Sequence, residues 1–163
     1  MTGVQIKADP TMSDTPPFPP PPDVAGTSLS GAVPYVITAE ENAALCRSTG
    51  VEPDADGQAH PIYYYIATQV GMGVTVAGMC EICEFDIDEG PMMGQSSVTF
   101  DRPLMTGQPY VVTGQILDLV RKPSRAFGVM DLLNYELRLS LPDGTPVVAS
   151  RNSWALPRRE LMA

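Results

Sequence analysis

The stretch Leu133-Asn134-Tyr135-Glu136-Leu137-Arg138-Leu139-Ser140 decides the fold class. Apolar and polar side chains alternate along its whole length, and this alternation is typical of a β-strand with one buried face. The turn signal Pro142-Asp143-Gly144 follows it. Val147 to Trp154 then predicts a returning strand. The C-terminal part of the chain is therefore expected to form a hairpin.

Two further strand signals precede this hairpin. A run with period two over residues 96–101 ends at Arg102-Pro103. Pro109 to Val120 predicts a long strand, in which Gly114 indicates a bulge. No helical pattern separates these segments, so we expect four strands in succession and an antiparallel sheet.

The N-terminal half contains the helical signals. Val33 to Ile37 predicts a short strand, and Thr38 predicts the N-cap of a helix that runs to about Ser48. The longest apolar stretch, Pro61 to Phe85, predicts either a strand followed by a helix or one long buried helix. This order of elements predicts an α+β fold with a helix packed on an antiparallel sheet.

Charge and composition exclude several classes of protein. The chain has 163 residues, of which 44% are hydrophobic, and this predicts one domain with a packed core. Ten Lys and Arg against 19 Asp and Glu give a net charge of −9, which argues against binding to nucleic acid or to anionic membranes. We find no secretory signal and no run long enough to span a membrane, so a cytoplasmic protein is expected.

Residues 1–30 are rich in proline and are expected to form a tail. Seven prolines fall between Pro10 and Pro22, and such a stretch favours extended polyproline II structure. The simplest interpretation is a disordered leader. The alternative is an arm that lies across the domain or a partner, with Phe18 as its only large anchor. In both cases residues 31–163 would form a single domain.

Several segments resemble a known family. Val98 to Leu104, followed by Gly107-Gln108, is similar to the strand and turn of the MaoC-like hydratases and dehydratases of acyl-thioesters. Asp143 to Ala149 is similar to the last hairpin of that family, and the helix that ends in Ser48-Thr49-Gly50 also fits. The resemblance covers roughly residues 31–157. It implies the hot-dog fold, in which a curved antiparallel sheet wraps around a long central helix.

The resemblance also implies a function. The expected reaction adds or removes water at a C=C bond next to a thioester carbonyl. Coenzyme A would be part of an acyl-CoA or similar acyl-thioester substrate, and no separate cofactor or metal is expected. A homodimer, or a heterodimer with another hot-dog subunit, is expected too, because a short sheet leaves unpaired edges.

His60 is the only histidine and the first candidate for catalysis. A histidine beside a carboxylate can activate water, so Asp56 and Asp54 are its candidate partners. The backbone amides of Ile62 and Tyr63, at a helix start, could stabilise an oxyanion. The alternative is a histidine that faces solvent beside ordinary loop carboxylates.

Other residues are candidates for substrate binding. Ile62, Tyr63, Tyr64 and Gly71 would line the acyl pocket, although the tyrosines could equally serve packing alone. Further candidates are the cationic side chains of a basic loop, which could bind the phosphates of coenzyme A or simply keep a sheet edge soluble. These are Arg121, Lys122 and Arg125.

Two other functions remain open. The chain could be a catalytically silent hot-dog subunit that shapes the acyl pocket of a partner, or a thioesterase that uses Glu81 or Glu84. Cys80 and Cys83 form a C-x-x-C pair, but no second pair exists to complete a zinc site. Two buried structural thiols are the favoured interpretation.

Overall fold

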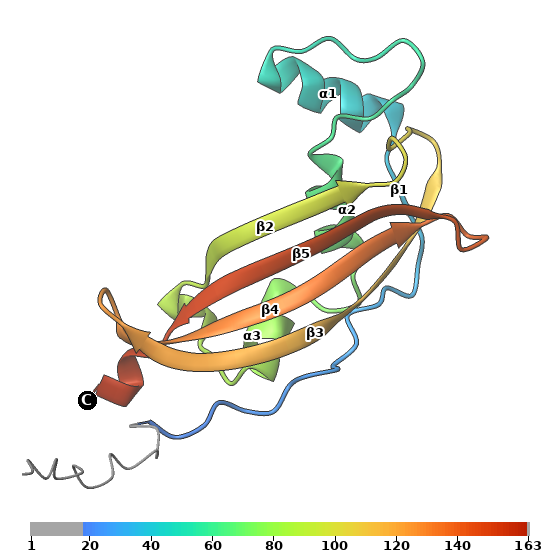
Figure 1. The fold of residues 1–163 in the computed structure, drawn as a ribbon. Helices are drawn as coiled ribbons and strands as arrows, with labels where there is room; N and C mark the ends of the chain where they lie inside the picture. Colours follow the sequence, from blue (N-terminus) through green and yellow to red (C-terminus); the bar gives the residue numbers. More distant parts are fainter. Residues whose placement is uncertain (1–17, 163) are drawn as a thin grey trace, which may run out of the picture.

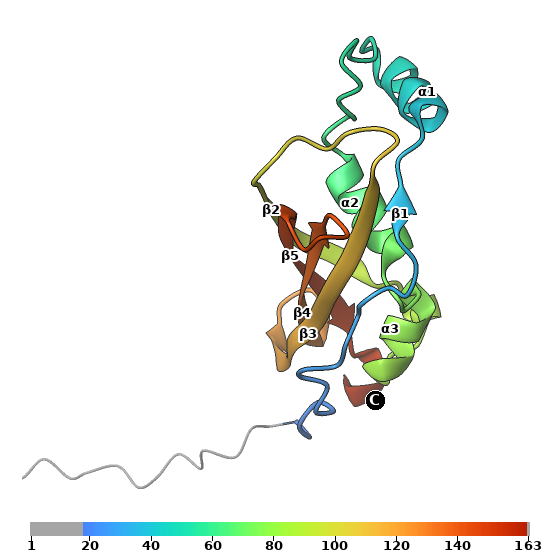
Figure 2. The same ribbon diagram turned by 90° about the vertical axis from the view of Figure 1, so that its right-hand side faces the viewer.

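The structure, a computed structural model, describes residues 18–162. This part of the chain contains a five-stranded antiparallel sheet in the order β1-β3-β4-β5-β2, with helices on one of its faces (Figures 1 and 2). The elements in chain order are β1 (Tyr35–Val36), α1 (Ala39–Thr49), α2 (Tyr63–Gly71), α3 (Val76–Ile82), η1 (Ile87–Glu89), β2 (Met92–Phe100), β3 (Pro109–Ser124), β4 (Gly128–Ser140), β5 (Pro146–Pro157) and η2 (Arg159–Met162). The predicted α+β class is confirmed.

The hairpin of β4 and β5 forms the middle of the sheet. Leu137 lies opposite Ser150 in the antiparallel register, and the side chains of β4 alternate between buried and more exposed positions, as the sequence predicted. The buried positions of β4 are Val129, Asp131, Leu133, Tyr135, Leu137 and Leu139. They face α2 and α3 and form the floor of the core together with the inward residues of β3 and β5.

Helix α1 projects beyond one end of the sheet (Figure 1). Its start is the predicted one: Thr38 Oγ1 accepts from the Glu41 N–H at 3.1 Å, and the Glu41 carboxylate accepts from the Thr38 N–H at 3.3 Å. These reciprocal bonds form a capping box, which satisfies two free amides at the helix start. Gly50 ends the helix in the left-handed conformation.

The long apolar stretch forms two short helices, α2 and α3, so both expectations for it, a strand followed by a helix and one long helix, are wrong. The break contains Gly71 and Gly73, at which other segments come close. A Cβ at Gly71 would lie 2.5 Å from Val112 Cγ2, and one at Gly73 would clash with the carbonyl oxygen of Ser30. Thr75 then caps α3, because its Oγ1 accepts from the Gly78 N–H at 3.0 Å. No helix within residues 18–162 is long and apolar enough to cross a membrane.

The end of the proline-rich segment lies along β3 (Figure 2). Three backbone N–H groups of residues 26–31 donate to carbonyls of β3 at 2.9–3.0 Å. The Leu29 side chain is fully buried and Val24 is 6% exposed. The expected boundary at residue 31 therefore cuts through an arm that is part of the core, and the interpretation as a leader does not hold for this part. Residues 1–17 lie outside the described residues.

Candidate functional site

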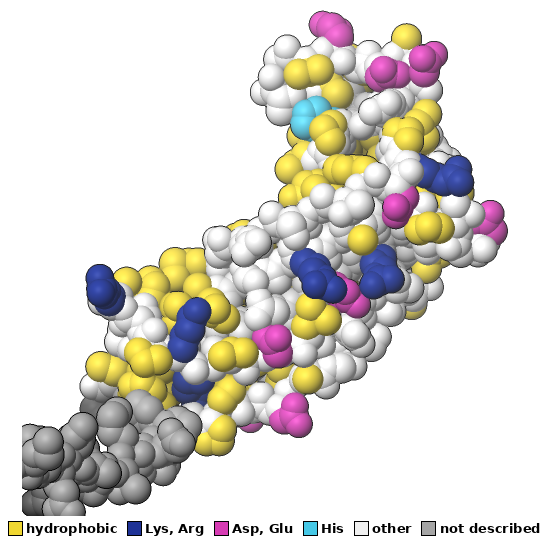
Figure 3. All heavy atoms as spheres, viewed as in Figure 1, with side chains coloured by type: hydrophobic (Ala, Val, Ile, Leu, Met, Phe, Trp, Pro, Cys, Tyr) yellow, Lys and Arg dark blue, Asp and Glu magenta, His cyan; other side chains and the backbone are white. Residues whose placement is uncertain are grey.

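His60 lies at the entry to α2 and lines a hollow of about 210 Å³. The hollow opens to the surface and is lined by α1 and the loop that follows it, through Cys46, Val51, Glu52, Asp54, Gln58, Ala59 and Pro61. Asn42 of α1 is 3% exposed and fixes the loop, because its Oδ1 accepts from the His60 N–H at 2.8 Å. Figure 3 shows the histidine at the base of the α1 lobe, beside apolar side chains that gather between this lobe and the sheet.

The ring of His60 is held by its own backbone. Its Nδ1 accepts from the Ile62 N–H at 3.2 Å. A ring nitrogen that accepts carries no proton, so the proton of the neutral ring lies on Nε2. The nitrogen left for a ligand is therefore a donor, whereas the activation of water needs a free lone pair.

The two candidate carboxylates do not form a dyad with His60. Asp54 Oδ1 accepts from the Asp56 N–H at 2.8 Å and from the Gln58 N–H at 3.5 Å, which closes a turn. Asp56 is exposed and does not line the hollow. No hydrogen bond or ion pair joins His60 to a carboxylate in the part of the chain that the structure describes. The structure brings His60 and Asp54 to the same hollow, but it leaves Asp56 outside.

The amides at the start of α2 are already used. The Tyr63 N–H donates to the His60 carbonyl at 3.0 Å, and the Ile62 N–H donates to the His60 ring. The two amides that we expected to stabilise an oxyanion thus form hydrogen bonds within the first turn of the helix instead. This geometry offers no oxyanion hole at that position.

The tyrosines separate into a packing residue and a surface residue. Tyr63 is 4% exposed and packs in the core. Tyr64 is half-buried and reaches β2, where its ring meets Phe100 edge to face at 6.1 Å between centroids. Ile62 and Phe100 are 38% and 41% exposed. Tyr64 therefore belongs to an apolar surface beside β2, and this surface can contact a ligand or a partner.

A polar chain, defined as Tyr64, Ser96 and Asn152, runs from this surface into the core. Ser96 Oγ donates to Asn152 Oδ1 at 2.7 Å and lies 3.0 Å from the Tyr64 hydroxyl. Ser96 has one proton to give, so Tyr64 is the donor in its bond to Ser96. Asn152 is 2% exposed. The sequence analysis did not predict this hydrogen-bonded series of side chains. Polar residues at inward positions of alternating strands are a signal that could have revealed it.

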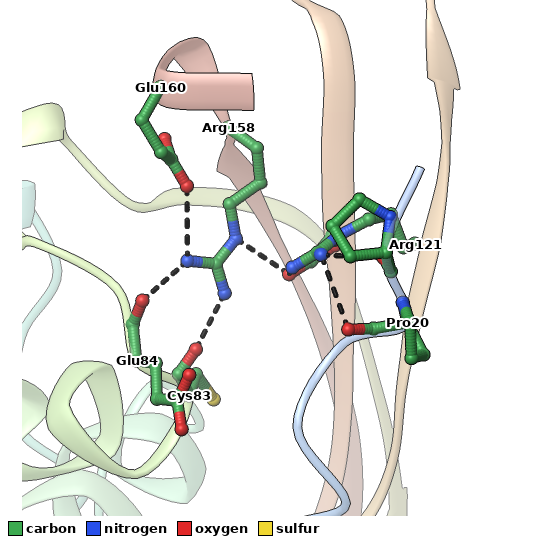
Figure 4. A network of polar contacts seen from close by, with 8 residues as sticks. Pro20, Cys83, Glu84, Arg121, Arg158 and Glu160 are labelled. Carbon is green, nitrogen blue, oxygen red and sulfur yellow. Dashed lines mark hydrogen bonds and ion pairs between the residues drawn. The ribbon is translucent and has the colours of Figure 1, made fainter. Parts of the chain in front are cut away.

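Arg121 has a structural role, and this corrects its prediction as a phosphate ligand. Its guanidinium donates to both oxygens of the fully buried Asp131 at 2.8 and 2.9 Å, and this contact raises the pKa of Arg121. It also donates to the carbonyl of Pro19 in the arm at 2.8 Å. Arg158 donates to Asp131 at 2.6 Å and to the carbonyls of Cys83 and Glu84, as Figure 4 shows for the carbonyl contacts. Lys122 and Arg125 are exposed.

The remaining candidates lie away from His60. Gly71 lines a different hollow of about 330 Å³ near β1. Glu81 and Glu84 are exposed, so neither faces the sheet as a catalytic carboxylate would. Cys80 and Cys83 are buried free thiols, as favoured from the sequence, and burial raises the pKa of Cys83 to about 12. Residues 18–162 contain no cluster of three side chains that could hold a metal ion.

Comparison with known proteins assigns the fold. No family model matches the chain, and no curated protein matches its sequence. The solved structures that are similar to this chain include the following three. The C-terminally truncated HadBC (3R-hydroxyacyl-ACP dehydratase) complex of Mycobacterium tuberculosis aligns over 82% of this chain and 98% of that chain, with 13% identity and a TM-score of 0.61. The ChsH1-ChsH2 complex of M. tuberculosis aligns over 80% and 83%, with 14% identity and a TM-score of 0.59. A MaoC-like dehydratase of Rhodospirillum rubrum aligns over 83% and 93%, with 14% identity and a TM-score of 0.58.

These likenesses show that the chain has the hot-dog fold, as its resemblance to the MaoC-like family implied. At 13–14% identity they assign no residue a role.

Proposed function

We propose that this chain is a hot-dog subunit of an acyl-thioester hydratase or dehydratase, in which it lines the acyl pocket and a second hot-dog chain supplies the acid–base groups. The observation that carries this proposal is the state of the His60 site. The ring has no carboxylate partner among the described residues, and the Ile62 and Tyr63 amides are used by the first turn of α2. A binding role fits these facts better than proton transfer.

The free edge of the sheet supports pairing with a second chain. β2 is hydrogen-bonded to β5 on one side and ends the strand order on the other. Its sequence, Met-Met-Gly-Gln-Ser-Ser-Val-Thr-Phe, contains no charged residue and no proline, the devices that usually protect an exposed edge. All its residues except Val98 are exposed. Such an edge is suited to strand pairing with another chain, either a second copy or a different subunit.

The similar structures favour the same arrangement. Two of the three are complexes named for two components, HadBC and ChsH1-ChsH2. Phe100 is the last residue of β2 and its ring meets that of Tyr64, so a chain paired with β2 would lie beside this aromatic contact. A pocket between the two chains would then have an apolar wall from this chain, which suits an acyl group.

A catalytic hydratase is the second candidate function. It is favoured by one observation, namely that His60 and Asp54 line the same hollow. A change of the Ile62 contact on ligand binding would be needed to free Nδ1 of the ring.

The purified chain and its His60→Ala variant can be compared on a panel of enoyl-CoA substrates, together with the binding of a saturated acyl-CoA. The proposal expects acyl-CoA binding, negligible hydration by the chain alone, and no effect of His60→Ala on binding. Turnover by the chain that falls by about 100-fold or more in His60→Ala would favour the second candidate instead. Absence of acyl-CoA binding would reject both.

The edge is tested separately by Ser97→Lys/Thr99→Lys, with Thr113→Lys of β3 as the control. All three positions are exposed. The double variant should lose association with a second hot-dog chain, measured as mass by light scattering, while the control keeps it. Association that survives both lysines would place the interface elsewhere.

A further inference from the structure

The face of the sheet that the helices leave free carries a row of apolar side chains at one end. Val120, Leu132, Ala155 and Met92 lie directly opposite one another across β3, β4, β5 and β2. The residues before and after Leu132 are fully buried on the helix side, so Leu132 points to the other side. Cross-strand partners share one side of a sheet, and the whole row therefore points away from the helices. We call these four residues the apolar row.

The apolar row is open to solvent, above all at its two ends. Val120 is 47% exposed and Met92 is 38% exposed, and the two residues between them are half-buried. Figures 1 and 3 view this face, and hydrophobic side chains gather on it toward the end of the sheet where β2 begins. Contiguous exposed apolar side chains of this kind mark surfaces that bind another protein.

Charged side chains flank the apolar row in a definite order on β3. Asp118, Val120 and Lys122 occupy successive outward positions of this strand, and all three are exposed. The carboxylate of Asp118 is held in place, because it accepts from Asn134 Nδ2 at 2.6 Å. The order acid, apolar, base becomes base, apolar, acid when the strand is reversed. This order is therefore complementary to a second copy of the same strand that runs in the opposite direction.

We infer that the apolar row is an interface between two copies of this chain, whose sheets pack face to face about a two-fold axis that runs along the row. Such an axis places each strand on its own copy in the reverse direction. Val120 then faces Val120 of the partner subunit, and Asp118 faces Lys122 of the partner subunit. Sheets that pack in this way lie about 10 Å apart, so the side chains of the two rows meet and exclude water. The interface is isologous, as in most dimers of identical chains.

The surroundings of the apolar row favour a second copy over a partner of strong charge. In the two rows that border it, Asp118 and Lys122 are the charged side chains. The other positions of these two rows are Asn134, Ser153, Gln95, Met130 and Pro157. One acid and one base leave these flanks without net charge, although the whole chain carries −9. Two copies can therefore approach on this face with less repulsion than their net charge would otherwise cause.

This interface goes beyond the proposed function, because it uses a different part of the sheet. The proposed pairing occupies the free edge of β2, whereas the apolar row lies on the outer face. One chain can form both contacts at once, and the two together would join four chains. Loss of the face contact alone should then halve the assembly and leave the edge pairing intact.

The first test is Val120→Glu, with Val36→Glu as the matched control. Val36 is a valine of β1 that is 41% exposed and lies outside the apolar row. In Val120→Glu two carboxylates meet on the axis and two valines lose their burial, so the Kd of the face contact should rise about 100-fold or more. By sedimentation at equal concentration, the unchanged chain should have twice the mass of Val120→Glu, and Val36→Glu should keep the mass of the unchanged chain. Circular dichroism checks that both variants are folded.

The second test exchanges the flanking charges. Asp118→Lys and Lys122→Asp each place like charges opposite each other in the proposed interface, so each variant alone should weaken it about tenfold. The double variant Asp118→Lys/Lys122→Asp restores opposite charges across the axis and should recover the mass of the unchanged chain. Loss of the bond between Asp118 and Asn134 is common to the single and the double variant, so a merely structural effect of Asp118→Lys would not be rescued.

Each remaining outcome overturns the inference. These outcomes are an equal mass of Val120→Glu and the unchanged chain, an equal loss in Val36→Glu, and a double charge exchange that fails to restore the mass. A mass that doubles only after deletion of residues 1–17 would mean that this segment of the chain covers the apolar row instead. The proposed function stands or falls separately, since acyl-CoA binding and Ser97→Lys/Thr99→Lys test it at the pocket and at the β2 edge.

Discussion

Replacing Asp131 by Asn should strongly destabilise the protein. Asp131 is fully buried near the start of β4 and accepts from two guanidinium groups, those of Arg121 and Arg158. Asn keeps the size of the side chain but removes its charge. Both arginines would then be left without the carboxylate that neutralises them.

The size of the effect follows from the burial of the three partners. The side chains of Arg121 and Arg158 are 10% and 4% exposed, so water can replace little of the lost contact. Removal of one partner from a buried ion pair costs about 3–5 kcal/mol. For a domain of this length each kcal/mol lowers Tm by roughly 2–4 °C. We therefore expect a fall in Tm of about 6–20 °C.

The measurement is urea unfolding followed by circular dichroism, with the free energy of unfolding compared at constant m-value. Glu136→Gln is the matched control. Glu136 lies on the same strand but outward, and its ion-pair partners Arg138 and Arg151 are 60% and 73% exposed. Exposed pairs contribute about 0–1 kcal/mol. A loss below about 1 kcal/mol in Asp131→Asn, or equal losses in the two variants, would refute the reasoning.

Three further predictions concern the arm, the thiols and the helix break. Deletion of residues 1–17 should leave the free energy of unfolding nearly unchanged. Deletion of residues 1–30 should cost about 3 kcal/mol or more in the same unfolding assay, because it removes Leu29 and backbone hydrogen bonds to β3. Equal stability of the two truncated proteins would contradict the conclusion that the arm is part of the core. Burial raises the pKa of Cys83 to about 12, so its thiol should stay protonated even at pH 9. Peptide mass mapping should therefore show that Cys83 resists a disulfide reagent until the protein unfolds. Rapid labelling of Cys83 in the native protein would contradict this prediction. Gly71→Ala should cost about 1–3 kcal/mol, because its Cβ would lie 2.5 Å from a valine of β3; an unchanged Tm would mean that this contact relaxes freely.

The fold could be predicted where the local pattern and the tertiary environment agree. The alternation in residues 133–140 correctly predicted a strand, β4, and Thr38 correctly predicted the start of α1. The break between α2 and α3 could not be seen, because it depends on how closely β3 and the arm approach Gly71 and Gly73. The arm was one of two interpretations left open for residues 1–30, because a composition dominated by proline does not show that attachment depends on a few apolar anchors such as Leu29.

The candidate site was predicted less well, because its contacts also depend on how distant segments meet in the fold. Arg121 looked like a free cation in the sequence, yet the register of β3 and β4 places it directly opposite Asp131. An acid at an inward position of an alternating strand was the available signal, since a buried carboxylate needs a partner. His60 was placed correctly at the start of a helix. Its hydrogen bond to the Ile62 amide, however, depends on torsion angles that residue types do not determine.

The difference between satisfied and unsatisfied groups distinguishes the structural centre of this fold from its candidate site. At Asp131 each buried charge is paired, and carbonyls at the end of α3 and in the arm accept from the two arginines. No polar group in this cluster therefore needs a ligand to complete its hydrogen bonds. On the side of α2 and β2 the opposite holds: an uncharged edge strand is unpaired, and Asn152 and Gln69 keep buried atoms without partners in the described structure. Departures from complete pairing lower stability, and proteins tolerate them mainly where function requires them. A partner strand on β2 would relieve the first of these departures, which is why the proposed function places a second chain on this side of the molecule.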